Sequence, residues 1–234
     1  MPIKRSGMSS RLEVPGFDLL QYLGGGPLTC VYAACDAERG WDCAVKVPRP
    51  DCADLVTAVK LLQREARVGL QVQHPNLVRI EEAHVTAPPW FLIMGLLGGE
   101  PLSTHLARMG TTAWGEAVWI TRQIGEALVS LHRKGFVHGD VKPDNIQLVG
   151  DGTAVLLDLG FAHRPGENTA FLEEGCVLGT VDYMAPELCG FRDEGDAASD
   201  IFSLGAHRRC QCQQKVQQQR PTNRSHGSSS PRSR

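Results

Sequence analysis

The chain has 234 residues, of which 42% are hydrophobic and 21% are charged, and its formal net charge is −2 at pH 7. These fractions are ordinary for a soluble protein, and the length is enough for one domain of two lobes. No apolar run approaches about 18 residues, so we expect no membrane span, and residues 1–11 lack the apolar core of a secretory signal. The eight cysteines are scattered without zinc-like pairing, which predicts reduced thiols and a cytoplasmic location.

The N-terminal part of the chain has the pattern of a strand-rich region. Three consecutive glycines within residues 23–32 are typical of a turn where the backbone can approach a ligand closely. Residues 43–47 alternate and are rich in β-formers, which predicts a strand. Lys46 lies between two apolar residues of that strand, so we expect it to be buried and to need a counter-charge.

The next segment predicts one amphipathic helix from about residue 54 to residue 71. Its apolar residues recur at spacings of three and four, which places them on one helical face. Glu65 in this helix offers a counter-charge for Lys46, and Glu81 and Glu82 are other acidic residues nearby.

A strand and a second helix are expected further along. The apolar run at residues 90–94, followed by the glycine-rich residues 95–99, indicates a buried strand that continues into a linker. Residues 113–134 then predict a long helix with an apolar stripe, and Gly135 is well placed just after its end. We expect this helix to be structural and to carry no chemistry.

The densest group of candidate catalytic residues follows that helix. Residues 138–145 read His-Gly-Asp-Val-Lys-Pro-Asp-Asn, and Asp158 begins an Asp-Leu-Gly motif thirteen positions later. Phosphoryl transfer from a metal-bound nucleotide needs an acid, a cation and hard oxygen ligands for Mg²⁺. Asp140, Lys142, Asn145 and Asp158 are residues of these types.

This segment resembles the catalytic loop and metal-binding motif of eukaryotic-type (Hanks-type) serine/threonine protein kinases of bacterial style. Residues 179–187 resemble the substrate-binding loop of the same family, and the resemblance covers about residues 17–206. It implies an α+β, bilobal protein-kinase-like fold. The small lobe, residues 17–97, would be an antiparallel sheet with one main helix, and the large lobe, residues 98–206, mostly helical and incomplete. Residues 1–16 would be an N-terminal extension.

The resemblance implies a function that uses ATP and Mg²⁺. The family transfers the γ-phosphate of ATP to serine or threonine hydroxyls of protein substrates. Asp140 would orient the hydroxyl, and Lys142 would neutralise the γ-phosphate. Asn145 and Asp158 would ligate Mg²⁺. By the same resemblance, the residues that bind the nucleotide would be Leu23, Gly24, Gly26, Val31, Ala44, Lys46, Glu65, Met94, Leu96, Asn145 and Asp158.

The family pattern also selects the partner of Lys46. In the family, the helix glutamate stands ten residues before the proline of a His-Pro-Asn turn, and Glu65 precedes Pro75 by ten. We therefore expect Lys46 to pair with Glu65. The alternative is an exposed pair of Glu65 with Arg64 or Arg67, which would contribute little to stability.

Several single residues carry further expectations. Residues 23–32 resemble the glycine-rich loop of the family, and Thr29 replaces its third glycine. Gly139 replaces an arginine that reads a phosphate in the activation segment, so activity would not depend on that phosphate. Thr180 would hydrogen-bond both catalytic residues, and Asp200 would brace the catalytic loop. Thr169 is a candidate phosphosite, although a plain surface threonine is the better interpretation.

The last 28 residues differ from the rest of the chain. Residues 207–234 hold seven Lys/Arg and no Asp/Glu, a charge of +7, which leaves 17 bases and 26 acids, or −9, in residues 1–206. So few apolar groups predict a disordered tail. It could be a basic arm for nucleic acid or an acidic membrane. We favour a shifted reading frame or a truncated gene, because the change falls inside an expected helix.

Two other classes of function remain open at this stage. A kinase-fold binding or scaffold module without catalysis is favoured by Thr29, Gly139 and the truncation, but the residues for catalysis are all present. A small-molecule phosphotransferase of related fold shares the acid and the metal ligands, whereas the loop at residues 179–187 argues for a protein substrate. We expect no specific nucleic-acid partner, and the oligomeric state stays open.

Overall fold

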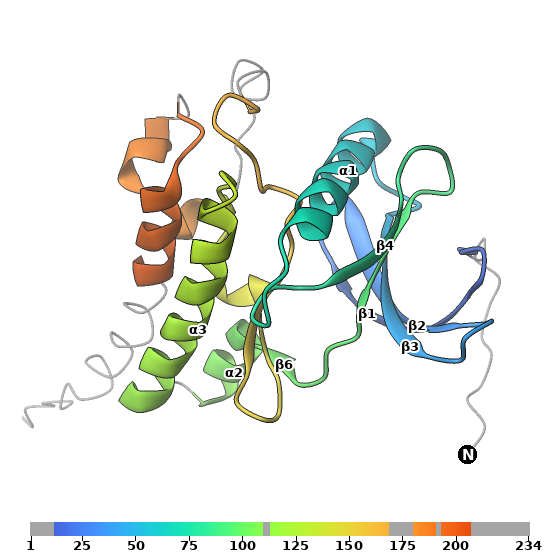
Figure 1. The fold of residues 1–234 in the computed structure, drawn as a ribbon, viewed down its shortest axis with the longest axis horizontal. Coiled ribbons are helices and arrows are strands. Elements are labelled where there is room, and N and C mark those ends of the chain that lie inside the picture. Colours follow the sequence, from blue (N-terminus) through green and yellow to red (C-terminus); the bar gives the residue numbers. More distant parts are fainter. Residues whose placement is uncertain (1–11, 110–112, 169–179, 191–192, 207–234) are drawn as a thin grey trace, which may run out of the picture.

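The N-terminal lobe is a sheet of five antiparallel strands in the computed structural model, which describes residues 12–109, 113–168, 180–190 and 193–206 (Figure 1). The strand order is β1-β2-β3-β5-β4. Neighbouring strands of the sequence pair directly except where helix α1 intervenes between β3 and β4. The strands are β1 Phe17–Gly25, β2 Thr29–Asp36, β3 Asp42–Pro48, β4 Ile80–His84 and β5 Phe91–Gly95.

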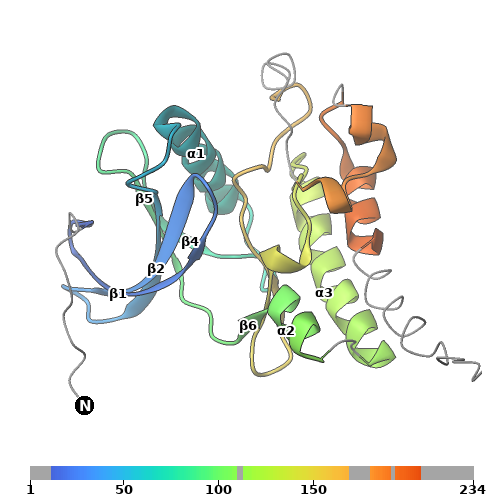
Figure 2. The same ribbon diagram turned by 180° about the vertical axis from the view of Figure 1, so that it is seen from behind.

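Helix α1, Leu55–Gln71, is a long helix packed on this sheet (Figures 1 and 2). Asp54 caps its N-terminus, because its side chain accepts a hydrogen bond from the backbone N–H of Thr57 at 2.9 Å. The buried positions of α1 recur at the spacings that the sequence predicted, and they include Ala58, Leu62 and Ala66. The predicted helix is confirmed, with residue 54 as its cap.

The second lobe is mostly helical. A small sheet of strands β6 Glu100–Pro101, β7 Ile146–Leu148 and β8 Ala154–Leu156 carries the loops of the candidate site. Figures 1 and 2 both show α3 lying beside a further helix at residues 197–206. The remaining elements are α2 Leu102–Met109, α3 Trp114–His132, and the 3₁₀ turns η1 Pro143–Asn145, η2 Val181–Tyr183 and η3 Pro186–Gly190.

The predicted helix at residues 113–134 is shorter than expected by a residue at its start and two at its end. Ala113 is the N-cap and Arg133 the C-cap. Gly135 adopts φ +77, a conformation that favours glycine, and donates its N–H to the carbonyl of His132 at 2.9 Å. Gly135 therefore ends the turn that follows the helix. Since Arg133 is the C-cap, Gly135 lies one residue beyond the C′ position.

Two hydrophobic clusters lie on opposite faces of the five-stranded sheet. Side chains alternate between the two faces along β3. Val45 and the residues two positions away from it therefore pack in a cluster that contains Val14, Phe91 and Ile93. Ala44 belongs to the larger cluster, which continues through α1 into α3 and β8. The alternating pattern thus turns the side chain of Lys46 toward the second lobe.

These findings confirm the predicted bilobal α+β fold. Val14, which the prediction placed in an N-terminal extension, is 6% exposed and packs into the small lobe. Thr169 and the tail at residues 207–234 lie outside the described residues, so those expectations stay predictions. Within the described ranges, no helix is both long and apolar enough to cross a membrane.

The contact of α1 with the sheet can be tested at a glycine. A Cβ on Gly69 would lie 2.2 Å from Cγ1 of Ile80, a distance too short for the neighbour to keep its place. Gly69→Ala is therefore expected to lower the free energy of unfolding by about 1–3 kcal/mol through overpacking. Chemical denaturation followed by circular dichroism measures this change.

The matched control is Gly125 in α3, where an added Cβ would meet nothing within 4 Å. Gly125→Ala should leave stability unchanged or raise it by up to about 1 kcal/mol, since alanine favours the helix. Equal effects of the two substitutions would contradict the close packing of α1 on β4.

Candidate active site

Lys46 on β3 is held by two carboxylates from distant parts of the chain. Its Nζ lies 2.6 Å from Oε2 of Glu65 on α1 and 2.8 Å from Oδ1 of Asp158, which follows β8. The side chains of Lys46 and Glu65 are 7% and 2% exposed, so this pair is buried. The prediction of Glu65 as the partner is confirmed. The alternative pair of Glu65 with Arg64 or Arg67 is wrong, because both arginines bind another segment.

The charges of these three groups depend on one another. Burial lowers the pKa of Lys46, but attraction to Asp158 and Glu65 outweighs it and raises that pKa overall. Burial raises the pKa of Glu65 against the attraction of Lys46. Desolvation acts in the same sense on Asp158, but Lys46 outweighs it and lowers the pKa of that carboxyl. The side chain of Asp158 is 36% exposed, so it is the carboxylate that a ligand can reach.

Strand register places the central group of predicted nucleotide-binding residues on one face of the sheet. Gly24 on β1 is the partner of Val31 on β2, and Val31 is the partner of Lys46 on β3. Ala44, two residues before Lys46, is the partner of Met94 on β5. Directly opposed residues share a face, as do residues two apart in a strand. These residues therefore line the same side of the sheet as the buried lysine.

Three further residues predicted for the nucleotide, Leu23, Gly26 and Leu96, lie at or just beyond the ends of strands. Leu23 on β1 is 48% exposed and Leu96, just after β5, is 38% exposed. Gly26 begins the β1–β2 turn and donates its N–H to the carbonyl of Thr29 at 3.0 Å. Gly25 is the position in this turn that requires glycine, because a Cβ there would lie 2.5 Å from the same carbonyl oxygen. The family pattern did not single out Gly25, although the run of three glycines contains it.

A second polar cluster forms around Asp140 in the catalytic loop. Its Oδ1 accepts a hydrogen bond from the hydroxyl of Thr180 at 2.8 Å. Its Oδ2 accepts from Nδ2 of Asn145 at 2.9 Å and lies 2.7 Å from Nζ of Lys142. Lys142 also donates to the hydroxyl of Thr180 at 2.7 Å. The predicted contacts of Thr180 with Asp140 and Lys142 are confirmed.

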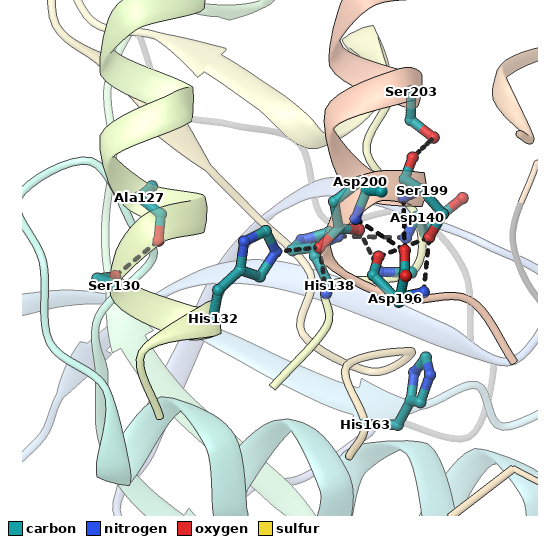
Figure 3. Close-up of polar contacts among 12 residues, drawn as sticks. Ala127, Ser130, His132, His138, Asp140, His163, Asp196, Ser199, Asp200 and Ser203 are labelled. Carbon is teal, nitrogen blue, oxygen red and sulfur yellow. Dashed lines mark hydrogen bonds and ion pairs between the residues drawn. The ribbon is translucent and has the colours of Figure 1, made fainter. Parts of the chain in front are cut away.

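Asp200 on the helix at residues 197–206 holds the start of the catalytic loop in place (Figure 3). Its carboxylate accepts the backbone N–H groups of His138 at 2.8 Å and Gly139 at 2.9 Å. The ring nitrogen Nε2 of His132, at the end of α3, lies 2.8 Å from the same carboxylate. The predicted brace is confirmed, and His132 is a partner that the sequence did not indicate.

Gly139, where the family has arginine, sits in a conformation that suits glycine. Its φ is +78, and a Cβ would lie 3.2 Å from the carbonyl oxygen of Phe161. The ring of His163 packs against this position and Nδ1 donates to the carbonyl of Phe161 at 3.0 Å. In the part of the chain that the structure describes, Nε2 of His163 is a buried atom without a hydrogen-bond partner. Figure 3 shows this ring apart from the Asp200 cluster.

The residues proposed as metal ligands have suitable oxygens. Both contacts of Asp158, from Lys46 and from the N–H of Gly160, go to Oδ1, which leaves Oδ2 for a cation. Asn145 uses its amide nitrogen on Asp140, so Oδ1 is the atom that it can offer. The described residues contain no cluster of three His, Cys, Asp or Glu that would hold a metal alone. Two hard oxygen ligands from the protein suit Mg²⁺. Phosphate oxygens and water molecules usually complete the coordination shell of this ion.

Comparison with known proteins is consistent with this geometry. The family model of the protein kinase domain matches residues 17–229. The chain belongs to the protein kinase domain family. The kinase-domain match includes residues 207–229, which are most of the tail at residues 207–234 that we expected to differ, and this tail lies outside the described residues.

Named relatives are bacterial kinases. The kinase domain is 33% identical over 189 residues to serine/threonine-protein kinase PknD of Mycobacterium tuberculosis, which covers 80% of this chain and 28% of the relative. It is 36% identical over 194 residues to serine/threonine-protein kinase Pkn1 of Myxococcus xanthus, with 81% and 27% covered. For serine/threonine-protein kinase PknA of M. tuberculosis the identity is 30%, with 81% and 44% covered. The chain thus spans less than half of the length of these relatives.

The brace at Asp200 predicts a large effect of a small change. Asp200→Asn keeps the shape of the side chain but replaces an acceptor oxygen with an N–H₂ group that faces N–H donors. Because the side chain is 2% exposed, we expect a loss of about 2–4 kcal/mol in the free energy of unfolding. Urea denaturation of the purified chain measures it.

Asp193→Asn is the matched control. Asp193 is exposed and accepts one backbone N–H, from Gly195 at 3.0 Å. We expect a change within about 0.5 kcal/mol. An Asp200→Asn variant as stable as this control would show that the brace carries no net energy.

Proposed function

We propose that this chain is an ATP- and Mg²⁺-dependent protein kinase that phosphorylates serine or threonine hydroxyls of protein substrates. The observation that carries the proposal is the hydrogen bond from the hydroxyl of Thr180 to Asp140 at 2.8 Å. It demonstrates that a hydroxyl can reach Oδ1 of this carboxylate at hydrogen-bonding distance. A substrate hydroxyl in the same relation would be oriented for attack and would have an acceptor for its proton.

The residues around Asp140 support this assignment. Lys142 lies 2.7 Å from both the carboxylate and the hydroxyl of Thr180, so a cation stands beside the acceptor position. A transferring phosphoryl group would develop negative charge near this ammonium, which would stabilise it. Asn145 fixes the carboxylate by donating to its Oδ2 and to the backbone carbonyl of Asp140.

The nucleotide site would lie against the sheet face that carries Lys46. We propose that the ammonium of Lys46 contacts phosphate oxygens, and that Glu65 keeps it in position when the phosphates are bound. Asp158 Oδ2 and Asn145 Oδ1 would hold Mg²⁺, which would supply positive charge to the phosphates when bound. Ala44, Met94 and the exposed leucines at the strand ends would contact the base.

The names of the relatives favour serine/threonine specificity. Those relatives are longer than this chain, so the substrates and partners of the whole protein belong to the proposal. The cytoplasmic location expected from the cysteine content also stays a prediction.

The decisive test is phosphotransfer from radiolabelled ATP to the chain itself and to a general protein substrate. Asp140→Asn keeps the size of the residue and removes the acceptor charge. Loss of a positioned acid–base group predicts a fall of about 10²- to 10⁴-fold in rate. Asp151→Asn is the control, since Asp151 is an exposed turn residue that bonds only to the nearby Thr153 in the described structure.

Two outcomes would contradict the proposal. Equal rates for the wild type and Asp140→Asn would remove Asp140 from its role. An absence of transfer by the wild type, together with binding of ATP that EDTA abolishes, would support the binding-module alternative instead.

A further inference from the structure

Two arginines on α1 reach across to the segment that follows the metal-binding motif. Arg67 makes a bidentate ion pair with Glu167, with both N–O distances at 2.6 Å. Arg64, one turn earlier on the same side of the helix, donates to Oδ1 of Asn168 at 2.7 Å. In both Figure 1 and Figure 2 the trace around residues 160–168 runs between α1 and the helix at residues 197–206.

The segment that receives these arginines is itself fixed. The N–H of Glu167 donates to the carbonyl of Arg164 at 3.1 Å, and the N–H of Arg164 donates back to Oε2 of Glu167 at 2.9 Å. Asn168 is 1% exposed. The guanidinium of Arg164 stacks over the ring of Phe136, 4.5 Å from its centroid. Residues 164–168 therefore form a turn that is held by its own hydrogen bonds.

The other side of this turn is hydrogen-bonded to the segment that precedes the helix at residues 197–206. The carboxylate of Glu194 accepts the N–H of Gly166 at 2.7 Å and the N–H of Asn168 at 3.0 Å. Glu194 precedes the helix at residues 197–206, which carries Asp200. A continuous set of contacts thus connects α1 to the helix that braces the catalytic loop.

These contacts bear on the Lys46 pair because of their place on α1. Glu65, the partner of Lys46, lies between Arg64 and Arg67 in the same helix. A helix is stiff over one turn, so fixing both arginines also fixes where Glu65 points. If α1 turned or moved outward, Glu65 would leave Lys46, and the buried ammonium would lose one of its two carboxylates.

We propose that Glu167 is a positioning residue, whose ion pair with Arg67, together with the Arg64–Asn168 hydrogen bond, holds α1 where Glu65 meets Lys46. We call these two contacts the α1 latch. This inference rests on the phosphotransfer proposed above. It adds that the helix is held by a carboxylate present in the translated chain, so the placement of Glu65 requires no covalent modification of the segment.

The charge state of Glu167 favours its ion pair with Arg67 at neutral pH. Hydrogen bonding from Arg67 lowers the pKa of Glu167 to about 2, so the carboxylate is charged at neutral pH. The side chains of Arg67 and Glu167 are 40% and 28% exposed. A pair with this exposure is weakened by salt, but bidentate geometry makes it one of the stronger surface pairs.

The test compares Glu167→Gln and Arg67→Gln with the charge-reversed double variant Arg67→Glu/Glu167→Arg. The matched control is Glu126→Gln, which breaks the exposed Arg122–Glu126 pair within α3. The first measurement is hydrogen–deuterium exchange of the full chain without nucleotide. We expect faster exchange in α1 for both single variants, slower exchange again in the double variant, and no change in β3 or in the control.

The second measurement is kcat and KM for Mg·ATP. Each single variant is expected to lose roughly fivefold to tenfold in kcat/KM, the size of one charge-assisted contact, and the double variant to regain part of it. The control should match the wild type.

The outcomes separate this inference from the proposed function. Unchanged α1 exchange in Glu167→Gln, equal acceleration in α1 and β3, or no recovery in the double variant would each overturn the latch. A wild type without phosphotransfer would defeat the proposed function, while the exchange data would still decide whether Glu167 holds α1.

Discussion

The position of one buried ammonium connects most features of this molecule. Lys46 lies on the central strand β3 of the small lobe, and its two carboxylate partners come from α1 and from the loop after β8. A buried lysine without counter-charge would be too costly to keep protonated. The two lobes must therefore keep a fixed relative position for Glu65 and Asp158 to contact the same nitrogen atom. The contacts around this site maintain that position.

The large lobe has its own fixed point at Asp200. Its carboxylate takes two backbone N–H groups of the catalytic loop and a histidine ring from α3. The loop between Gly139 and Asn145 thereby presents Asp140 and Lys142 toward Thr180. The two anchors, Lys46 and Asp200, are joined by the chain through the metal-binding motif and the turn at residues 164–168. This continuity connects two polar clusters whose residues are far apart in sequence.

Local signals in the sequence predicted much of this arrangement. The period of apolar residues predicted α1 and α3, and capping by Asp54 and the conformation of Gly135 account for the small errors at their ends. The pair of Lys46 with Glu65 followed from the spacing to Pro75 in a family pattern. Gly25 was missed, because which of three adjacent glycines lacks space depends on the strand register, which only the folded backbone defines.

Long-range polar pairs were the hardest to predict. Arg64 and Arg67 were the alternative to Lys46 as partners of Glu65, whereas they bind residues about 100 positions later. His132 and Asp200 are 68 positions apart. A single sequence offers many charged residues of each sign, and only the packing of α1 against the large lobe, and of α3 within that lobe, selects among them. Such pairs, unlike helix periodicity, have no local signature.

The central claim is that Glu65 acts on a bound nucleotide through Lys46. It is tested most directly by a double-mutant cycle on the dissociation constant of Mg·ATP, with Lys46→Met, Glu65→Gln and the two combined. If Glu65 serves to position Lys46, the double variant should bind no more weakly than Lys46→Met alone. Losses that simply add in the double variant would contradict the account, because Glu65 would then act independently of the lysine.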